Sequence, residues 1–404
     1  MTLGVAVIGA GMAGRAHAAA YRTAPTLYAS TLPPLRYVSI ADVSAELGDL
    51  AARRFGYERS DTSWQALAED PAISVVSVVV ANRLHREMVE GLLAAGKHVL
   101  CEKPLSDTLE DARAMVKAAD AASSLARIGL TYRRAPGVAA LREVVLDGTL
   151  GNVLHVDARY WCDYAADPQG PIAWRYKGGP GSGALADLGS HAAYVAEFLA
   201  GDITEVSGGR FVTSITERPV ALGPVVGHGK VAVGDTYEPV ENDDYAAFSA
   251  RFAHGAGVIQ VSRVAAGHPN GFALEVFGDR GAAKWAQERP AEFELVFNDG
   301  SPAAVNGYRR VIVGPHHPYV SGGLPMDAPG VGLGQNEGFA YQARAFLEEV
   351  AGLDECSSLP RCASFSEGVH NMQVLSAVAE SAVKQGAAVP VPDQRSVQLE
   401  GASA

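Results

Sequence analysis

The sequence is poor in cysteine and in long apolar runs. Its four cysteines, Cys101, Cys162, Cys356 and Cys362, include no CxxC pair, so neither a disulfide framework nor a structural zinc site is expected. The longest clean apolar run, residues 75–81, is far below the ~18 residues that cross a bilayer. The first segment lacks the basic region and cleavage site of a signal peptide. These absences predict a cytoplasmic protein that does not enter a membrane.

Positive charge is also scarce. Lys and Arg total 33 against 45 Asp and Glu, and no block of five like charges occurs, so nucleic acid is not an expected partner. Apolar residues, by contrast, make up 48 % of the 404 positions. That content is sufficient for sizeable cores in two domains.

A glycine-rich turn follows the first apolar run. Residues 3–8 predict a strand, which ends in the sequence GAGMAG at residues 9–14, and a helix-favouring stretch comes next. Glycines in such a turn let the backbone approach a pyrophosphate, which then faces the N-terminus of the helix. We therefore expect a dinucleotide to contact Gly9, Gly11, Met12 and Ala13.

Asp42 ends the next predicted strand, residues 35–41, after a loop insertion at residues 25–34. A carboxylate at this position would accept hydrogen bonds from the adenosine ribose and repel a 2′-phosphate, which favours NAD over NADP. The alternative is that Asp42 caps the following helix.

Two kinds of strand pattern divide the chain. Up to residue 131, strands alternate with helices, which predicts a doubly wound parallel sheet of the Rossmann type with Gly9, Asn82 and Lys103 at carboxyl ends of strands. Alternating runs between residues 153 and 313 predict a second α/β domain with a large, mostly antiparallel open sheet. Helices should cover one face of that sheet, and the other is a candidate subunit interface. The predicted domains are residues 1–131 and 132–392, with a tail at 393–404.

The order of three motifs resembles the Gfo/Idh/MocA family of sugar and inositol oxidoreductases. These are GAGMAG, then Asn82 and His85 in an NxxH element, then AGKHVLCEKPL. The resemblance implies that Lys103 is catalytic and that the peptide before Pro104 is cis. It also implies that Asn82, His85, Glu102 and Lys103 lie beside NAD. The chain has Val80-Ala81 where the family usually has Thr-Pro.

Asp187 and His191 stand four residues apart in GSGALADLGSH, so both should share one face of a helix. Such a pair alone is more often a cap and a surface histidine, but the resemblance implies that both join Lys103. Oxidation of an alcohol by hydride transfer requires a base near neutral pKa, which suits His191. Asp187 would hold the hydroxyl or the imidazole, and Lys103 would stabilise alkoxide charge. No metal is expected, since His316-His317 lack a third spaced ligand.

Aromatic and basic side chains are candidates for binding a sugar ring, because they combine stacking with polar contacts. They are Tyr132, Arg133, Tyr164, Trp174 and Arg175. The alternative is that the aromatics belong to an ordinary core. The segments YRRAP, YAADPQGPIAWR and GPHHPY are similar to the levoglucosan dehydrogenase branch of the family. Residues 217–244 form a Pro/Gly-rich insertion to which the sequence assigns no role.

Together these features predict an NAD-dependent dehydrogenase that oxidises a ring secondary hydroxyl of a sugar, an anhydro-sugar (at C3) or an inositol. The alternatives are a keto-sugar reductase, an NAD-dependent glycosidase on the same scaffold, and an inactive nucleotide-sensing protein. A homo-oligomer, dimer or tetramer, is expected to form through the open sheet.

Overall fold

The computed structural model describes residues 2–29, 31–223, 231–300, 305–324, 326, 328, 330–331, 333–353 and 359–393. The chain forms two compact units. The first contains the chain up to Pro136 and Val313–Val369; the second contains Gly137–Ile312 and the segment that begins at His370. Residues 313–369 thus pack with the first unit, although the sequence prediction placed them in the second domain. Apart from Asp393, the predicted tail at 393–404 lies outside the described residues.

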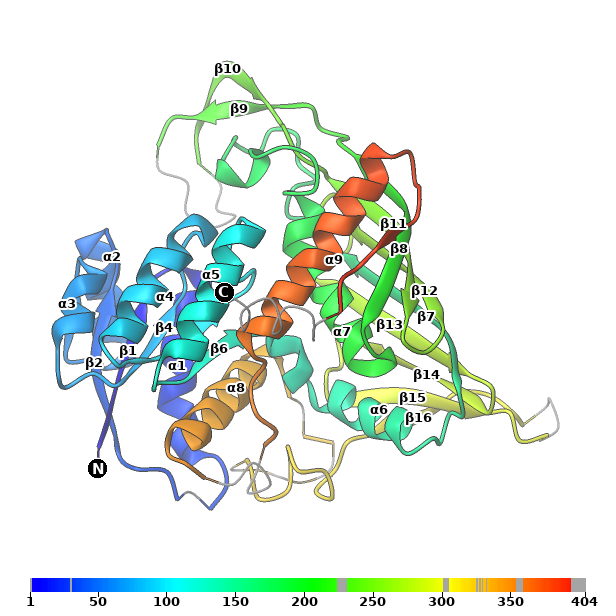
Figure 1. Cartoon of the computed structure of the whole chain (residues 1–404), viewed down its shortest axis with the longest axis horizontal. Coiled ribbons are helices and arrows are strands. Elements are labelled where there is room, and N and C mark those ends of the chain that lie inside the picture. Colours follow the sequence, from blue (N-terminus) through cyan, green and yellow to red (C-terminus); the bar gives the residue numbers. More distant parts are fainter. Residues whose placement is uncertain are drawn as a thin grey trace. The chain divides into compact units, whose positions relative to one another are not determined.

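A six-stranded parallel sheet forms the centre of the first unit, in the order β3-β2-β1-β4-β5-β6 (Figure 1). All six residues of β1 are buried, as expected for a parallel strand covered on both faces. Strand order reverses at β1 and β4, and ligands bind beyond the carboxyl ends of the strands at such a point. The strands are β1 (Leu3–Ile8), β2 (Leu35–Ala41), β3 (Arg59–Asp61), β4 (Val75–Val78), β5 (His98–Glu102) and β6 (Ala126–Gly129).

Helices connect these strands, and capping side chains begin several of them. The helices are α1 (Met12–Thr23), α2 (Ala45–Phe55), α3 (Trp64–Glu69), α4 (His85–Ala94) and α5 (Leu109–Ala121). Ser44 and Ser63 cap α2 and α3, and Thr108 caps α5 by accepting from the Asp111 amide. Strand β6 ends at Gly129, so Tyr132 lies in a 3₁₀ turn, Thr131–Arg134.

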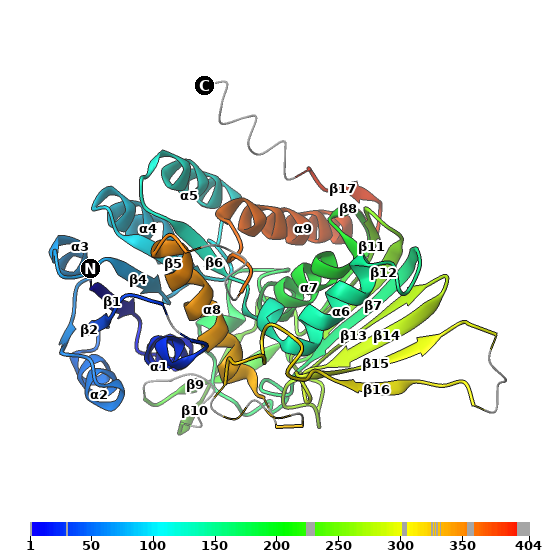
Figure 2. The same cartoon turned by 90° about the horizontal axis from the view of Figure 1, so that it is seen from below.

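Helix α8 (Gln335–Val350) explains why residues 313–369 belong to the first unit. It packs against α1 (Figure 2). Its buried Arg344 pairs with Glu348 at 2.6 Å and donates to the Leu27 carbonyl at 2.8 Å. A buried ion pair whose remaining donors are also satisfied fixes this helix to the loop after α1.

The second unit is built on a nine-stranded sheet in the order β16-β15-β14-β13-β7-β12-β11-β8-β17. Only the β7–β12 pair is parallel among the pairs that the structure describes in this sheet. The predicted α/β fold with a mostly antiparallel sheet is confirmed. The strands are β7 (Val153–Trp161), β8 (Ile203–Val212), β11 (Tyr245–Phe252), β12 (Ala256–Ser262), β13 (Gly271–Gly278), β14 (Gly281–Ala286), β15 (Glu292–Phe297), β16 (Arg309–Ile312) and β17 (Val389–Pro390).

Helices cover one face of this sheet, as Figure 2 shows. They are α6 (Pro136–Leu146), α7 (Ser190–Ala200) and the part of α9 (Phe365–Val383) that begins at His370. Alternate residues of β11, such as Ala246 and Phe248, are buried on the covered side, whereas Ser249 and Arg251 are exposed. No helix in the described part of the chain is long and apolar enough to cross a membrane.

The insertion at residues 217–244 contains an antiparallel hairpin that the sequence did not predict. Its strands are β9 (Glu217–Ala221) and β10 (Val233–Pro239), with Tyr237 opposite Pro219. Residues 224–230, between the two strands, lie outside the described residues. The hairpin forms a sheet of its own, separate from the nine-stranded sheet (Figure 1).

Candidate active site

The glycine turn after β1 leaves room for a ligand on one side only. A Cβ on Gly14 would lie 1.8 Å from the Gly9 carbonyl oxygen, and a Cβ on Gly9 would lie 2.0 Å from that of Val79, so both positions exclude side chains. At Gly11, by contrast, no atom lies within 4 Å of such a Cβ, and no side chain caps α1. The first amides of α1 therefore form an open cradle that fits a pyrophosphate.

Asp42 is held at the end of β2 by two backbone amides. Its Oδ2 accepts from Ala10 at 2.8 Å and its Oδ1 accepts from Ser44 at 2.9 Å. Ser44, not Asp42, caps α2 by accepting from the Leu47 amide, so the capping alternative for Asp42 is wrong. The first of these bonds ties the carboxylate to the glycine turn, which brings together two groups predicted to bind the cofactor.

His85 is fully buried and connects two loops at the ends of β4 and β5. Its Nε2 lies 3.1 Å from the Val80 carbonyl oxygen, and its Nδ1 lies 3.1 Å from that of Leu105 and 3.3 Å from Cys101 Sγ. Burial lowers the pKa of this imidazole, which favours a neutral ring whose single N–H donates to one of the two carbonyls. The ring thus joins the partly exposed Asn82 turn to the loop after Lys103.

Glu102 and Lys103 follow β5, and the Lys103–Pro104 peptide is cis, as the resemblance implied. Glu102 accepts from its neighbour's amide at 3.1 Å and contacts His17 Nε2 at 2.9 Å. His17 in turn contacts Ser77 Oγ at 3.0 Å. Sequence reasoning missed His17; a histidine on the buried face of the first helix is the only local signal for it.

Tyr132 and Arg133 follow β6 and are held within the first unit. The Tyr132 hydroxyl accepts from Gln335 Nε2 at 3.3 Å, and Arg133 Nη1 pairs with Glu367 at 2.6 Å. Burial opposes the charge of Glu367, but Arg133 and Ser364 outweigh it and hold the pKa of that carboxyl below its usual range. This ion pair orients the Arg133 side chain.

Asp187 lies in a π-helical turn, Leu185–Gly189, immediately before α7. The two predicted acid–base residues therefore lie in consecutive helical segments of different pitch and not in one α-helix. The Tyr164 hydroxyl donates to Asp187 Oδ2 at 2.8 Å. Burial and the Asp187 charge raise the pKa of Tyr164 well above its usual value, so this phenol stays protonated and acts as a donor. π-Turns of this kind often occur at functional sites.

His191, in the first turn of α7, is partly exposed. Its Nδ1 lies 3.2 Å from the hydroxyl of Tyr194, a buried residue on the same helix. The Tyr160 ring stands 6.1 Å away, centroid to centroid. These aromatic neighbours fix the plane of the imidazole.

Asp243 builds the turn that leads to Asp187. Its buried carboxylate accepts from the amides of Gly181, Gly183 and Leu185 at 2.7, 3.0 and 2.8 Å. A Cβ on Gly183 would lie 2.1 Å from the Asp243 carbonyl oxygen, so this glycine is required for the close approach. The sequence prediction did not include Asp243; its available signal is the acidic run at residues 241–244 directly before a strand.

Trp174 and Arg175 form an exposed stacked pair. Trp174 is 64 % exposed, and the Arg175 guanidinium lies 4.5 Å from the centre of its ring. The Arg175 carbonyl accepts from Asn242 and from Arg263, which is itself paired with Asp244 at 2.9 Å in the interior. An aromatic face presented to solvent on a rigid support suits stacking against a ring substrate.

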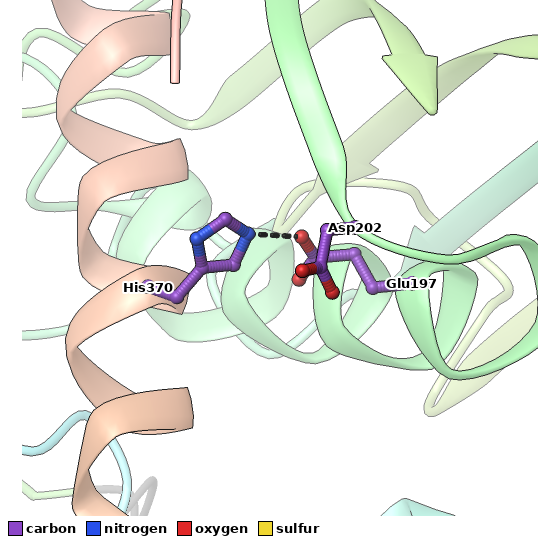
Figure 3. A group of neighbouring side chains, drawn as sticks. All are labelled: Glu197, Asp202 and His370. Carbon is purple, nitrogen blue, oxygen red and sulfur yellow. Dashed lines mark hydrogen bonds and ion pairs between the residues drawn. The ribbon is translucent and has the colours of Figure 1, made fainter. Parts of the chain in front are cut away.

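One group of side chains in the described residues could hold a metal ion. Figure 3 shows it: Glu197 at the end of α7, Asp202 before β8, and His370 on α9, whose ligand atoms lie within 4.8 Å of one another. His370 Nε2 is hydrogen bonded to Glu197 Oε1 at 2.7 Å, and the same oxygen accepts from the Ile203 amide. Burial lowers the pKa of His370, but the bond to Glu197 and the two acidic charges outweigh it, so the net shift is upward. These contacts describe an ion pair between Glu197 and His370, in which the buried Nδ1 of His370 has no hydrogen-bond partner among the described residues.

The structure thus groups the predicted residues within each unit. Asp42 bonds the amide of Ala10 in the glycine turn, and His85 contacts the loops of both Asn82 and Lys103. In the second unit, Tyr164 meets Asp187. Lys103 belongs to the first unit, whereas Asp187 and His191 belong to the second.

Comparison with known proteins gives full-length matches. Residues 3–130 match the model of the GFO/IDH/MocA oxidoreductase family with an NAD-binding Rossmann fold, and residues 138–284 match the GFO/IDH/MocA C-terminal domain. The chain is 35 % identical to levoglucosan dehydrogenase of Pseudarthrobacter phenanthrenivorans, over 95 % of this chain and 97 % of that protein. It is 36 % identical to 1,5-anhydro-D-fructose reductase of Ensifer adhaerens, over 41 % of this chain and 49 % of that protein. A solved structure of levoglucosan dehydrogenase with NADH and levoglucosan superposes with a TM-score of 0.85 at 32 % identity, covering 97 % of this chain and all of that one.

Proposed function

The chain belongs to the Gfo/Idh/MocA oxidoreductase family, and we propose that it oxidises a ring secondary hydroxyl of a sugar, an anhydro-sugar or an inositol to the ketone. The family, the NAD cofactor and the oxidoreductase class, all predicted from the motifs, are confirmed by the comparisons. Within the proposal, an anhydro-sugar like levoglucosan, oxidised at C3, is the preferred substrate, because the likeness to levoglucosan dehydrogenase extends over nearly the whole chain.

The residues of the first unit fit NAD. The uncapped start of α1 and the open space at Gly11 would receive the pyrophosphate, with Met12 and Ala13 beside it, and Asp42 would accept from the ribose. Asn82, His85 and Glu102 would support the nicotinamide end. When bound, NAD supplies the acceptor for the substrate's hydride.

His191 is the proposed base, and Tyr194 sets its tautomer. If Nδ1–H donates to the Tyr194 hydroxyl, the lone pair is on Nε2, which can then take the proton of the substrate hydroxyl. Asp187, held by Tyr164, would orient that hydroxyl, and the Lys103 ammonium would stabilise the developing alkoxide. The observation that carries the proposal is this Tyr164–Asp187 bond, because it fixes an acceptor next to the candidate base.

The substrate ring is proposed to stack on Trp174, with Arg175, Tyr164, Tyr132 and Arg133 supplying polar contacts. Support comes from the exposed face of Trp174 and from the buried bonds that hold Arg175. Aromatic faces combined with fixed donors are the usual means of binding pyranose rings.

A reductase that runs in the opposite direction is the second candidate. The partial match to 1,5-anhydro-D-fructose reductase favours it. The same groups would serve, with His191 returning a proton to the alkoxide, since the base of one direction is the acid of the other.

The test is a panel of substrates, with the formation or consumption of NADH measured by its absorbance. Purified protein is given NAD with levoglucosan, glucose, inositols and glycosides, and in parallel NADH with keto-sugars. Lys103→Ala should lower kcat by about a hundred- to a thousandfold with NAD affinity unchanged, whereas Lys117→Ala, which alters an exposed lysine of α5, should change neither. Cleavage of aryl glycosides without net NADH formation would replace the proposal with a glycosidase; full activity of K103A would remove Lys103 from it.

We propose further that the open face of the nine-stranded sheet joins copies of the chain. Val258 on β12 is 40 % exposed there, and Tyr245 lies on the same side of neighbouring β11. Light scattering on the purified protein would measure the mass of the particle in solution, and a monomer at micromolar concentration would contradict the interface.

A cytoplasmic location is also proposed. It is based on the cysteines, since Cys101, Cys162 and Cys362 are buried and free.

A further inference from the structure

Arg218, on strand β9 of the insertion hairpin, is a charged residue that is completely buried. Its guanidinium donates to three main-chain carbonyls of one segment: those of Ala165, of Asp167 at 2.8 Å and of Gly170 at 3.4 Å. It also lies 4.3 Å from the centre of the Tyr176 ring. No carboxylate pairs with it in the part of the chain that the structure describes.

Burying an arginine without a carboxylate partner is energetically unfavourable compared with burying an apolar side chain. Burying a cation without a paired anion costs several kcal/mol, and an apolar side chain of similar volume avoids that cost. Burial accordingly lowers the pKa of Arg218. What an apolar side chain lacks is a planar fork of donors, which can fix the direction of several carbonyls at once.

The segment that Arg218 holds, residues 164–176, carries the proposed ring-binding groups. Tyr164, at its start, donates to Asp187, and Trp174 with Arg175 lies near its end. The three carbonyls lie between these groups in the chain. The hairpin supports the same stretch twice more, because the Ile172 amide donates to Pro219 at 2.8 Å and the Tyr237 hydroxyl donates to Gln169 at 3.1 Å.

Two cations contact the far end of the segment. The guanidinium groups of Arg218 and Arg263 lie 4.3 and 4.8 Å from the centre of the Tyr176 ring. Both cations contact a ring that is itself buried, where cation–π attraction is strongest. A shift of Arg218 would therefore move both ends of the segment.

We propose that Arg218 is a positioning residue for the substrate and that the β9–β10 hairpin, through it, determines which ring the enzyme accepts. The inference rests on the proposed function. Arg218 acts on the reaction through the placement of Tyr164 against Asp187 and of the Trp174 face. Its loss should therefore raise KM and change the ranking of substrates that differ in ring shape, more than it changes NAD affinity.

Arg218→Lys keeps the charge but replaces the fork by a compact ammonium, whose single nitrogen cannot take the positions of both Nη1 and Nη2. We expect kcat/KM for the best substrate to fall by about tenfold to a hundredfold, mainly through KM. Arg344→Lys is the matched control, because Arg344 is also buried and also donates to a main-chain carbonyl, that of Leu27, within the first unit. It should lower the melting temperature without changing the substrate ranking.

A double-mutant cycle separates positioning from stability. With Tyr164→Phe, the loss in R218K should be less than multiplicative, since both changes act on one contact. Tyr237→Phe, which alters an exposed bond only, should shift KM in the same direction by about twofold and serves if R218K does not fold. Fully multiplicative losses, or an unchanged KM in both R218K and Y237F, would overturn the proposal.

Hydrogen exchange gives a readout that needs no turnover. In R218K the amides of residues 165–172 should exchange faster than in wild type, above all Ile172, and those of the glycine turn should not change. If wild type oxidises no ring in the panel while this exchange pattern holds, the proposed function fails and the support by Arg218 stands. Unchanged exchange in R218K would overturn the role of Arg218 even in an active enzyme.

Discussion

The nucleotide end of the first unit and the proposed substrate segment of the second unit, residues 164–176, are made rigid in opposite ways. Around Gly9 and Gly14, rigidity comes from missing side chains, because backbone atoms approach to distances that exclude a Cβ. Around residues 164–185, it comes from buried charged side chains, Asp243 and Arg218, which bond main-chain groups of one loop each. The first arrangement depends on backbone approaches, one local between Gly14 and Gly9 and one from Gly9 to Val79, which follows the neighbouring strand β4 of the sheet. The second depends on single side chains that bond a loop more than forty positions away.

This difference has a consequence for how each site tolerates change. A backbone cradle accepts any ligand that offers the right phosphate but has no room for a side chain at Gly9 and Gly14. A loop held by buried charges can be redirected by a substitution elsewhere in the chain. The cofactor end is therefore expected to stay constant while the substrate end diversifies.

The largest loss of stability is expected at Gly14, where the backbone of the glycine turn leaves no room for a side chain. Gly14→Ala places a Cβ 1.8 Å from the Gly9 carbonyl oxygen, so the turn must open, with a loss of about 3 kcal/mol in the free energy of unfolding. Gly11→Ala, with open space at its Cβ, should leave that free energy unchanged and weaken NAD about tenfold. Chemical denaturation and calorimetric titration measure the two quantities. Equal stability of both variants would contradict the backbone account.

Asp243→Asn tests whether the buried carboxylate holds the turn that leads to Asp187. The asparagine side chain is neutral and accepts through one oxygen only, so all three amides lose a charged acceptor and at least one of them faces an NH2 group, at about 2–3 kcal/mol. The turn to Asp187 should loosen and kcat should fall with it. Glu241→Gln, two residues earlier and exposed, should leave the free energy of unfolding nearly unchanged. A kcat unaffected by D243N at full folding would separate the turn from catalysis.

Asp42→Asn tests whether this one side chain determines the preference for NAD over NADP at the glycine turn. The preference of kcat/KM for NAD over NADP should fall by about tenfold to a hundredfold, because the repulsion of a 2′-phosphate is removed. Glu46→Gln, exposed in the first turn of α2, is the control and should leave the ratio unchanged. A wild-type preference for NADP would refute the assignment of Asp42.

The smallest effect concerns the Glu197–His370 pair, a buried charge pair in the second unit (Figure 3). The pKa of His370 is raised in the folded chain, so the stability that its proton contributes is complete below the unfolded value near 6.5 and is lost as pH rises through the folded value. His370→Gln should therefore be about 1.5 kcal/mol less stable than wild type at pH 6, and the gap should narrow by pH 9. His254→Gln, at an exposed position, should show no such trend, and a gap that widens with pH would contradict the ion pair.

The parts of the fold that could be predicted are those written in short continuous runs. Strand β1, the glycine turn and Asp42 follow from the spacing of a few neighbouring residues, and the cis peptide before Pro104 follows from one motif. The end of β6 could not be predicted. Residues 128–132 have strand-forming side chains, but at Gly129 a Cβ would lie 2.7 Å from a Glu102 oxygen, and the chain turns there.

The substrate end was harder to predict because its determinants are single residues with distant partners. An arginine such as Arg218 in a polar insertion looks like a surface residue until the carbonyls that surround it are known. Asp243 gives a weak signal in the sequence as an acidic residue next to a strand. The backbone amides that donate hydrogen bonds to its carboxylate lie about sixty residues earlier. Asp187 and His191 were found by motif, whereas the π turn between them has no recognised sequence signal.

That π turn changes how residues should be counted along this stretch. Within Leu185–Gly189 the chain holds one residue more than an α-helical turn would use. Removing one residue there would restore the regular helix and rotate everything before it by about 100° relative to α7. Asp187 would then leave the Tyr164 hydroxyl, although the composition of the site would be unchanged. In an alignment of related enzymes, a one-residue gap at this turn would thus mark a different acid–base arrangement, even where both the aspartate and the histidine are present.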